Sequence, residues 1–452
     1  MRATLALVLS ACALVACKFD PLPQISGDGG GGPGDDGGPG SDACTGLACQ
    51  VASCPQNMET RVLGTVFLPN GMTPLANADI YVPSRDPGPI EHGAMCANCG
   101  PLPGDPITRV RSDSAGRFVL RNIPSGADIP VVITAGKWRR QLRLAQVDDC
   151  TETVLATDVS RLPRSRADMT PPTTSVDLPT IAVSTGQADA LECLVRKIGI
   201  ADSEFGTVGS PAAVHLFSPG VNGGARMGPF GVFASSTTAL WGSFTTLAPY
   251  DLVMLSCEGV VDASTKPASA LAAMKSYADA GGRIWAEHQH NLWIDGLPAS
   301  GLTQPEWETI ADFSPNSMNL PAGDILIDTA NPAGMDFATW QQNVSGIAAG
   351  RIPMPNGEGR TTAISVDMTR AIRWAYFILS GMMRPQNFMF TTPVTPGQNR
   401  CGRVAFSDMH VSASSMSQSN QPFPAGCSNA PMTAQELAMA YLLFELQSCV
   451  PL

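Results

Sequence analysis

The chain has 452 residues, of which 44% are hydrophobic and 15% are charged, and its formal net charge is −11. This composition is typical of folded domains, and the length allows two or three of them. Nucleic acid and anionic lipid surfaces are bound by clustered Lys and Arg, so we expect no nucleic-acid partner. The densest basic cluster, residues 137–143 (KWRRQLR), is too small to reverse the sign of the field.

Residues 1–16 predict a signal peptide. Arg2 precedes an apolar run over 3–16, which is shorter than the roughly 20 residues that a membrane-spanning helix needs. The segment LVAC that ends at Cys17 resembles a bacterial lipobox, which implies cleavage before this cysteine and lipid attachment to it. The resulting membrane anchor, followed by Lys18 rather than Asp, favours an outer-membrane lipoprotein of the cell envelope. An ordinary signal peptide with an incidental cysteine is the alternative.

Residues 17–43 predict a tether, because Gly, Pro and Asp dominate the segment and residues 26–42 offer nothing apolar to seed a core. Eleven cysteines follow Cys17. In the oxidising envelope most of them should form disulfides, and an odd number leaves at least one thiol unpaired. A zinc knot around the Cys-x-x-Cys of residues 96–99 is the less favoured alternative.

Residues 44–150 predict a small all-β domain. Short alternating strands are separated by turn sequences such as Asn70-Gly71, and a hairpin turn is expected at 113–116. The stretch VRSDSAGRFVLRNIPSG, from residue 110, resembles the carboxypeptidase regulatory-like domain, which implies an immunoglobulin-like, carbohydrate-binding-like sandwich. Trp138 and the arginines after it are candidates for contact with an envelope glycan or with a neighbouring domain. The proline- and threonine-rich residues 151–190 predict a linker.

Residues 191–452 predict an α/β domain, because helical and strand patterns alternate. The last predicted helix begins with a capping box at Thr433 and Glu436. The expected helices cover residues 186–200, 269–280, 369–383 and 432–449, and the expected strands cover residues 212–217, 250–256, 283–288 and 401–408.

Polar side chains follow three of the predicted strands. In an open parallel sheet, ligands bind outside the carboxyl ends of the strands, where the residues after each strand meet. If these three strands are parallel, one cysteine, two acids and three histidines converge there. They are Cys257, Glu258, His288, His290, Asp408 and His410.

The strand–helix–Gly-Gly–strand pattern of residues 250–288 and the segment CGRVAFSDMH resemble the class I glutamine amidotransferase-like superfamily, in its trehalose-utilisation-like branch. The resemblance implies a flavodoxin-like parallel sheet and a cysteine hydrolase site. Cys257 would be the nucleophile, a nearby histidine the base, and Glu258 or Asp408 its orienting acid. The family's G-x-C-x-G elbow reads LSCEG here, and its His-x-Glu pair is missing.

Two other interpretations of this group remain open. His288, His290 and His410 could hold zinc, together with an acid. The same side chains could instead only hydrogen-bond loop backbone. We favour an envelope-anchored protein with a binding or structural role and a divergent or degenerate site that needs no cofactor. A hydrolase of amide or carbohydrate-related substrates, and a carbohydrate-binding module, are the alternatives, with an envelope glycan or another envelope protein as partner.

Overall fold

The computed structural model describes residues 46–56, 58–220, 223–228, 231–298, 301–395, 397–411 and 421–451. The predicted signal peptide (1–16), the lipidation site Cys17 and the tether (17–43) lie outside the described residues. Residues from Thr45 to Leu452 belong to one compact unit. Within its described part, no helix has both the length and the apolar character to cross a bilayer.

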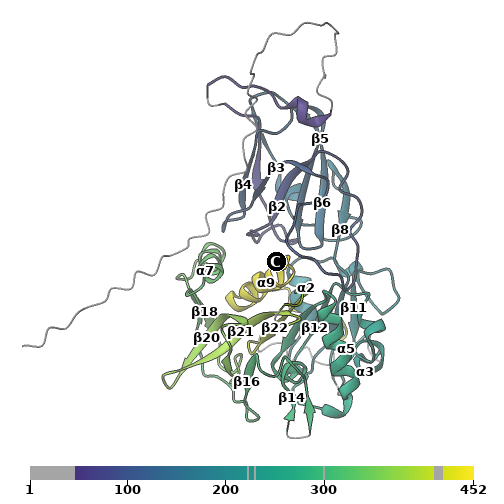
Figure 1. Cartoon of the computed structure of the whole chain (residues 1–452), viewed down its shortest axis with the longest axis vertical. Coiled ribbons are helices and arrows are strands. Elements are labelled where there is room, and N and C mark those ends of the chain that lie inside the picture. Colours follow the sequence, from purple (N-terminus) through teal and green to yellow (C-terminus); the bar gives the residue numbers. More distant parts are fainter. Residues whose placement is uncertain are drawn as a thin grey trace, which may run out of the picture. The chain divides into compact units, whose positions relative to one another are not determined.

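The N-terminal β region consists of two sheets that share one hydrophobic core (Figure 1). The five-stranded sheet is antiparallel throughout, in the order β3-β2-β5-β6-β8. The three-stranded sheet has the order β4-β1-β7. The strands are β1 (Arg61–Thr65), β2 (Asp79–Pro83), β3 (Pro106–Arg111), β4 (Arg117–Arg121), β5 (Gly126–Ala135), β6 (Trp138–Val147), β7 (Glu152–Val154) and β8 (Thr173–Asp177).

Two expectations for this region are corrected. The turn at 113–116 forms, with Gly116 N–H donating to the Asp113 carbonyl, but β3 and β4 on either side of it pair in different sheets. Residues 151–190 are not a linker, because they contain β7, the short helix α1 (Thr157–Ser160), β8 and β9 (Ile181–Ser184). These strands are too short to give a clear strand pattern in a proline- and threonine-rich sequence. They form because they pair with strands that are distant in the chain.

The C-terminal region is built on one ten-stranded sheet, in the order β10-β11-β9-β12-β13-β22-β21-β20-β17-β18. The first six strands are parallel and the last four continue the sheet in antiparallel pairs. The predicted parallel alignment of the three site-bearing strands is thereby confirmed. The strands are β10 (Phe205–Gly206), β11 (Val214–Phe217), β12 (Leu252–Leu255), β13 (Arg283–Glu287), β17 (Gly323–Ile327), β18 (Arg351–Met354), β20 (Ala371–Leu379), β21 (Met382–Thr392) and β22 (Gly402–Ser407).

The helix expected over residues 369–383 is wrong. These residues form β20, a two-residue turn and the start of β21. The turn consists of Ser380 and Gly381, which both have positive φ angles, +50° and +80°, as a tight hairpin turn requires. The length of this apolar stretch suggested a helix. Its run Ile-Arg-Trp-Ala-Tyr-Phe-Ile is nevertheless rich in β-branched and aromatic residues, which favour a strand.

Helices cover both faces of the large sheet. The strands alternate between two cores: Val183, Met254 and Trp285 face the core that α2 and α9 complete, whereas Val253 and Ile284 face the core of α5. The first core runs on into the β region without a break, and it explains why the chain from Thr45 onward is one unit. The helices are α2 (Leu191–Lys197), α3 (Ser236–Ala239), α4 (Phe244–Leu247), α5 (Ala268–Asp279), α6 (Leu292–Asp295), α7 (Pro332–Ser345) and α9 (Ala434–Leu446).

The described residues also contain short secondary elements in the connections. Two small antiparallel pairs lie outside the main sheets, β14 with β15 and β16 with β19. The elements are the 3-10 turns η1 (Leu47–Gln50), η2 (Asp202–Glu204), η3 (Ala263–Thr265) and η4 (His288–Asn291), and the strands β14 (Gly296–Leu297), β15 (Leu302–Thr303), β16 (Ala311–Phe313) and β19 (Ala363–Val366). Of these, η4 directly follows β13 and carries two of the histidines predicted for the site.

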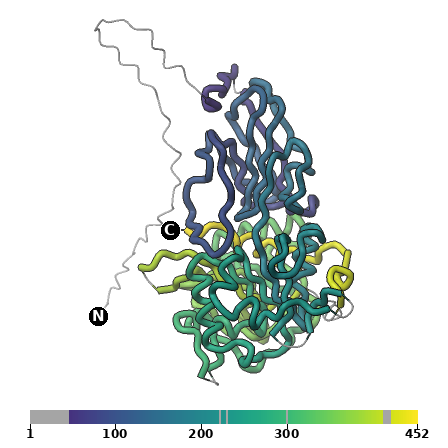
Figure 2. Tube along the Cα trace, turned by 90° about the vertical axis from the view of Figure 1, so that its right-hand side faces the viewer, coloured from purple at the N-terminus to yellow at the C-terminus, as the bar shows by residue number. Residues whose placement is uncertain are grey.

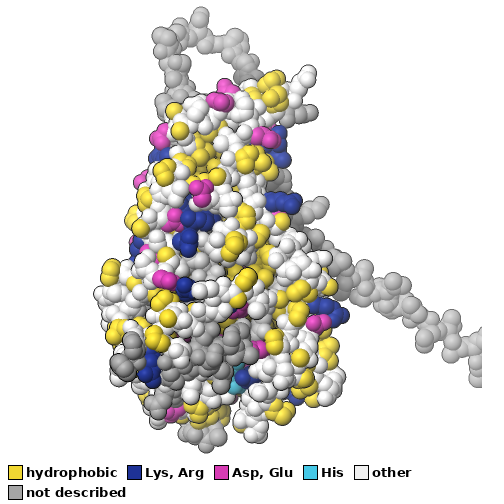
Figure 3. Space-filling view, turned by 180° about the vertical axis from the view of Figure 1, so that it is seen from behind, with side chains coloured by type: hydrophobic (Ala, Val, Ile, Leu, Met, Phe, Trp, Pro, Cys, Tyr) yellow, Lys and Arg dark blue, Asp and Glu magenta, His cyan; other side chains and the backbone are white. Residues whose placement is uncertain are grey.

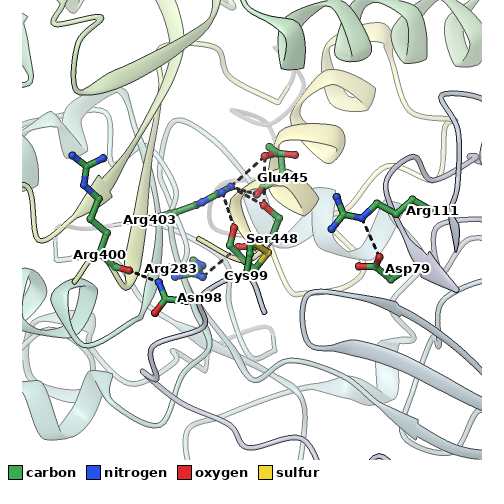
Figure 4. Close-up of a disulfide and its surroundings, with 10 residues drawn as sticks. Asp79, Asn98, Cys99, Arg111, Arg283, Arg400, Arg403, Glu445 and Ser448 are labelled. Atoms are coloured by element: carbon green, nitrogen blue, oxygen red, sulfur yellow. Dashed lines mark hydrogen bonds and ion pairs between the residues drawn. A yellow bond between two sulfur atoms is a disulfide. The ribbon is translucent and has the colours of Figure 1, made fainter. Parts of the chain in front are cut away.

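Disulfides tie the β region to the C-terminal region. Cys96 and Cys99, in the connection between β2 and β3, bond to Cys401 and Cys449 respectively. Figure 4 shows the surroundings of the second bridge, where Arg403 on β22 reaches Glu445 and Ser448 at the end of α9. Two further disulfides join Cys54 to Cys150 and Cys193 to Cys427. The yellow C-terminal segment accordingly runs beside the blue β strands (Figure 2).

Candidate functional site

The candidate site lies where β12, β13 and β22 end. These strands are neighbours in parallel register, with Leu255 opposite Ala286 and Ala286 opposite Phe406. The residues after each strand therefore leave the sheet at the same edge. Cys257 follows β12 by two residues, and His288 follows β13 directly. The sheet, not the loops, brings these segments together.

Three of the six predicted residues form one cluster. Cys257, His288 and His410 each have a potential ligand atom, and these atoms lie within 4.8 Å of one another. The Cys257 thiol is 3.1 Å from Nδ1 of His288, and the two imidazole rings are 5.4 Å apart between centroids. All three side chains are buried. Among the described cysteines, Cys257 is also the free one, so the unpaired thiol expected from the odd count lies in the site.

His288 is held from its far side. Its Nε2 lies 3.2 Å from the Ser317 hydroxyl and 3.1 Å from the amide nitrogen of Gln289. Ser317 in turn accepts a hydrogen bond from Thr362 at 2.8 Å. The backbone of His288 has a φ of +39°, a conformation that an L residue adopts at a cost and that surrounding contacts must maintain. This strained turn aims Nδ1 at the sulfur.

The local electrostatics keep the three groups neutral. Burial, together with smaller contributions from the carboxyl groups of Glu287 and Asp189, raises the pKa of Cys257 to about 12, against a hydrogen bond that Gly259 N–H donates to the sulfur. Burial lowers the pKa of His288 to about 3. It also holds the pKa of His410 well below its usual value. The site is thus a thiol facing two uncharged imidazoles.

The other predicted residues have structural partners instead. Glu258 accepts hydrogen bonds from Lys266 Nζ at 2.5 Å and from Gly220 N–H at 2.8 Å, in a fully buried ion pair. His290 turns away from the cluster, with Nε2 2.9 Å from the Ser256 carbonyl and Nδ1 accepting from the Trp293 indole N–H. The predicted zinc set with His290 is therefore wrong, because both of its ring nitrogens are already engaged.

Asp408 is buried and lies two residues before His410 in the sequence, but its carboxyl group does not hydrogen-bond the cluster. Its Oδ2 accepts a hydrogen bond from Ala363 N–H at 2.7 Å, and Oδ1 has no partner among the residues that the structure describes. Burial raises the pKa of this carboxyl to about 7. Asp408 therefore fixes the β19 segment under the site rather than orienting a histidine.

A group of buried acids near the site was not predicted from sequence. Glu287 hydrogen-bonds Asp189, and burial together with this second carboxyl raises the pKa of Glu287 well above its usual value. Asp189 also accepts from Val411 N–H at 2.9 Å. Burial raises the pKa of Glu192 to about 8 and that of Glu358 to about 7. Glu287 lies next to the end of the predicted strand 283–288, so its position could have indicated that it reaches the site, whereas Glu358 lies in a loop far away in sequence.

A separate cleft of about 790 Å³ lies between the five-stranded sheet and the end of α9. Its lining includes Tyr81, Arg109, Arg111 and Glu445. Trp138, proposed above as a contact for a glycan or a neighbouring domain, is fully buried and packs on Phe444 of α9, with ring centroids 4.8 Å apart. Its indole therefore serves the contact with the C-terminal region and offers no face to a glycan.

Comparison with known proteins identifies no family. No protein-family model matches the sequence, and no curated protein matches it. A crystal structure of a type II cohesin–X-dockerin complex from Acetivibrio cellulolyticus, an N-terminal interface mutant, is similar over 33% of this chain and 75% of that chain. The sequence identity is 14% and the TM-score is 0.17, a value that carries no argument about fold or function.

Proposed function

We propose that the chain is a lipid-anchored cell-envelope protein with a binding or structural role, whose sheet-edge site is a divergent form of the class I glutamine amidotransferase site. Four disulfides among the described residues fit a protein exposed to an oxidising compartment outside the cytoplasm. Anchoring through Cys17 is the part of this proposal that the lipobox motif supports. On the face in Figure 3, cationic and anionic side chains are interspersed, so charge alone would not select a partner there.

The order of the parallel strands supports the flavodoxin-like part of the proposal. Apart from the two-residue edge strand β10, the parallel strands β9, β11, β12, β13 and β22, numbered along the chain, stand in the sheet as 2-1-3-4-5, the order of flavodoxin-like folds. The candidate site lies beside the switch point between β9 and β12, where such folds bind their ligands. The four antiparallel strands beyond β22 are an addition to this pattern.

The burial of Cys257 is the observation that carries the conclusion of a divergent rather than an active hydrolase site. A nucleophilic cysteine is a thiolate, exposed to substrate and stabilised by a cation or a helix N-terminus. Cys257 is 0% exposed, and burial raises its pKa to about 12. It is not among the described residues with positive φ, and helix α5 begins only at Ala268. The sharp strand-to-helix turn of a nucleophile elbow is therefore not formed here.

Thiol labelling of the native full-length protein tests this conclusion. We expect iodoacetamide to modify Cys257 far more slowly in the native protein than in the urea-unfolded protein, because the sulfur is both buried and protonated. A glutamine-mimicking chloroketone should be equally unreactive. Rapid, saturable modification of Cys257 by that chloroketone would instead establish the amide-hydrolase alternative.

Lipid anchoring has its own test. A Cys17→Ser variant should lose the lipid and move from the membrane fraction to the periplasmic fraction, whereas Cys12→Ser, in the predicted signal peptide, should change neither property. Mass spectrometry of the mature N-terminus measures the lipid directly. An unmodified Cys17 within a mature chain would refute the anchor.

A second candidate function, carbohydrate binding, is favoured by the cleft described above rather than by Trp138. Its volume of about 790 Å³ is within the range of ligand pockets, and the Tyr81 hydroxyl in its lining is buried without a hydrogen-bond partner among the described residues. Soluble envelope glycan fragments should raise the melting temperature. Arg109→Ala should weaken the affinity for these fragments about tenfold, since charged hydrogen bonds contribute about 1.5–3 kcal/mol. Arg143→Ala, on β6 outside the cleft, is the control.

A further inference from the structure

The cluster at the sheet edge contains three donors, of the two kinds that a metal ion such as zinc prefers. A thiol and two imidazoles, from Cys257, His288 and His410, present ligand atoms within 4.8 Å of one another. Each comes from a different strand end of the parallel sheet, so the fold itself and no single flexible loop sets their spacing. We propose that these three side chains form a mononuclear binding site for a divalent transition-metal ion of the Zn(II) class.

The observed spacing is close to that of a metal centre. Tetrahedral zinc bonds sulfur at about 2.3 Å and imidazole nitrogen at about 2.0–2.1 Å, so its ligand atoms lie roughly 3.3–3.6 Å apart. The Cys257 sulfur is already 3.1 Å from Nδ1 of His288. The widest separation in the group, at most 4.8 Å, requires a closure of about 1 Å, which rotation of one buried ring supplies. Three protein ligands leave a fourth position for water or a substrate atom.

The charges around the site also suit a metal. On binding, the ion would displace the Cys257 proton into water and convert the thiol to a thiolate, which leaves a net positive charge on the site. The buried pair of Asp189 and Glu287, which acts on Cys257 electrostatically, would offset the positive charge that results. The nearby cation Arg360 acts in the opposite direction, because its charge disfavours further positive charge at the site.

Two hydrogen-bonding observations point to an ion rather than to simple packing. His410 is 2% exposed, yet its Nε2 has no partner within the described part of the chain, a loss that costs about 1–3 kcal/mol in a buried group. His288 has Ser317 behind its Nε2, which is the outer contact that metal-bound histidines usually make and which leaves Nδ1 free to ligate. His290, in contrast, has both nitrogens engaged.

Metal titration of the purified full-length protein tests the site without any assay of activity. After dialysis against a chelator, the wild-type protein should bind one equivalent of Zn(II) in competition with a chromophoric chelator. Cys257→Ser and His410→Gln should each weaken binding at least 100-fold. Co(II) should give a thiolate-to-cobalt charge-transfer band and intense tetrahedral d–d bands in the wild-type protein, and Cys257→Ser should abolish the charge-transfer band.

Two control variants separate this ligand set from other histidines. His290→Gln removes a neighbouring histidine of the same strand end, and His92→Gln removes one that pairs with Asp251 at a partly exposed position. Both should keep one equivalent of Zn(II) with unchanged affinity. Equal loss in His290→Gln, or unchanged binding in Cys257→Ser, would overturn the proposal, as would absence of Zn(II) binding by the wild-type protein. Should a ligand variant not fold, X-ray absorption of the zinc-loaded wild-type protein decides, because it must show one sulfur and two imidazole ligands.

This test is distinct from that of the proposed function. Labelling reports whether reagents reach the sulfur, whereas titration reports whether the sulfur is a ligand. A protein that resists labelling and binds no Zn(II) would leave the proposed function standing without the metal site.

Discussion

The ion pair between Glu258 and Lys266 is a charged interaction with almost no access to water. Both side chains are 1% exposed, and Lys266 also lies 5.2 Å from the centre of the Trp241 ring. Removing one partner from a buried pair leaves an uncompensated charge and costs about 3–5 kcal/mol. We therefore expect Lys266→Met to lower the free energy of unfolding by about that amount, measured by urea denaturation. The double variant Glu258→Gln/Lys266→Met should recover part of the loss, and a double variant as unstable as the single one would contradict this.

Glu192 predicts a pH dependence of stability. Burial raises its folded-state pKa to about 8, above the usual value of about 4.3 for glutamate, so the folded protein holds this proton more tightly than the unfolded chain does. Its contribution to stability is complete below about pH 4 and is lost as the pH rises through about 8. Between about pH 5 and pH 7, the wild-type protein should lose roughly 1.4 kcal/mol per pH unit relative to Glu192→Gln.

Urea midpoints of both proteins across that range measure this difference. The comparison removes the opposite contribution of His288 and His290, whose lowered pKa values make folding less favourable as the pH falls. Parallel curves for the two proteins would show that Glu192 does not take up its proton in the folded state.

The hairpin of β20 and β21 depends on the backbone freedom of its turn. Leu379 pairs with Met382 across two residues with positive φ, and a Cβ added to Gly381 would meet nothing within 4 Å. The cost of Gly381→Ala is then purely conformational, about 1–2 kcal/mol. Ser380→Asn should act in the opposite direction, because Asn tolerates this conformation better. Melting temperatures test both, and a neutral Gly381→Ala would mean that the turn changes its type.

The elements that the sequence predicted correctly are those with a strong local signal. The final helix begins at the predicted capping box, where Thr433 and Glu436 each accept a hydrogen bond from the other's backbone N–H. The strands ending before Cys257, His288 and Asp408 are short apolar runs bounded by turns or polar residues. Strand β9, by contrast, is four residues within a proline- and threonine-rich segment, and only its pairing with β11 and β12 makes it a strand.

The candidate site was predictable only in part, because only some of its residues have a strong local signal in the sequence. Parallel strand ends identify which segments meet, and Cys257, His288 and His410 follow from that rule. The rule does not fix where a side chain points after the strand has ended. His290 lies two residues beyond His288 but turns to Trp293, because the 3-10 turn η4 rotates it away from the cluster. Glu358 lies in a loop and interacts electrostatically with Asp189, an approach that no local pattern encodes.

The disulfides that connect the β region with the C-terminal region should contribute strongly to the stability of the whole unit. The Cys99–Cys449 bridge spans 350 residues and holds the connection between β2 and β3 to the chain after α9. Removal of a native disulfide typically costs about 2–5 kcal/mol. We expect Cys99→Ser/Cys449→Ser to lower the melting temperature and to make this connection sensitive to protease.

The matched control is Cys54→Ser/Cys150→Ser, whose bridge closes 96 residues within the β region alone. This variant should lose stability without exposing the segment between β2 and β3 to cleavage. Equal proteolysis of both variants would show that the Cys99–Cys449 bridge does not protect this connection, which the Cys96–Cys401 bridge and the continuous hydrophobic core also hold.

The bonding pattern of Cys96 and Cys99 has a consequence for the export that we propose. Their partners follow 305 and 350 residues later, so during such export both sulfurs would enter the oxidising compartment before Cys401 and Cys449. The first partners open to them are each other and the cysteines nearby in sequence, which are Cys44, Cys49, Cys54 and Cys150, and each such bond would have to be broken again. We therefore expect maturation of this chain to depend on an isomerase that reshuffles early disulfides, because an oxidase by itself would trap it with incorrect bridges.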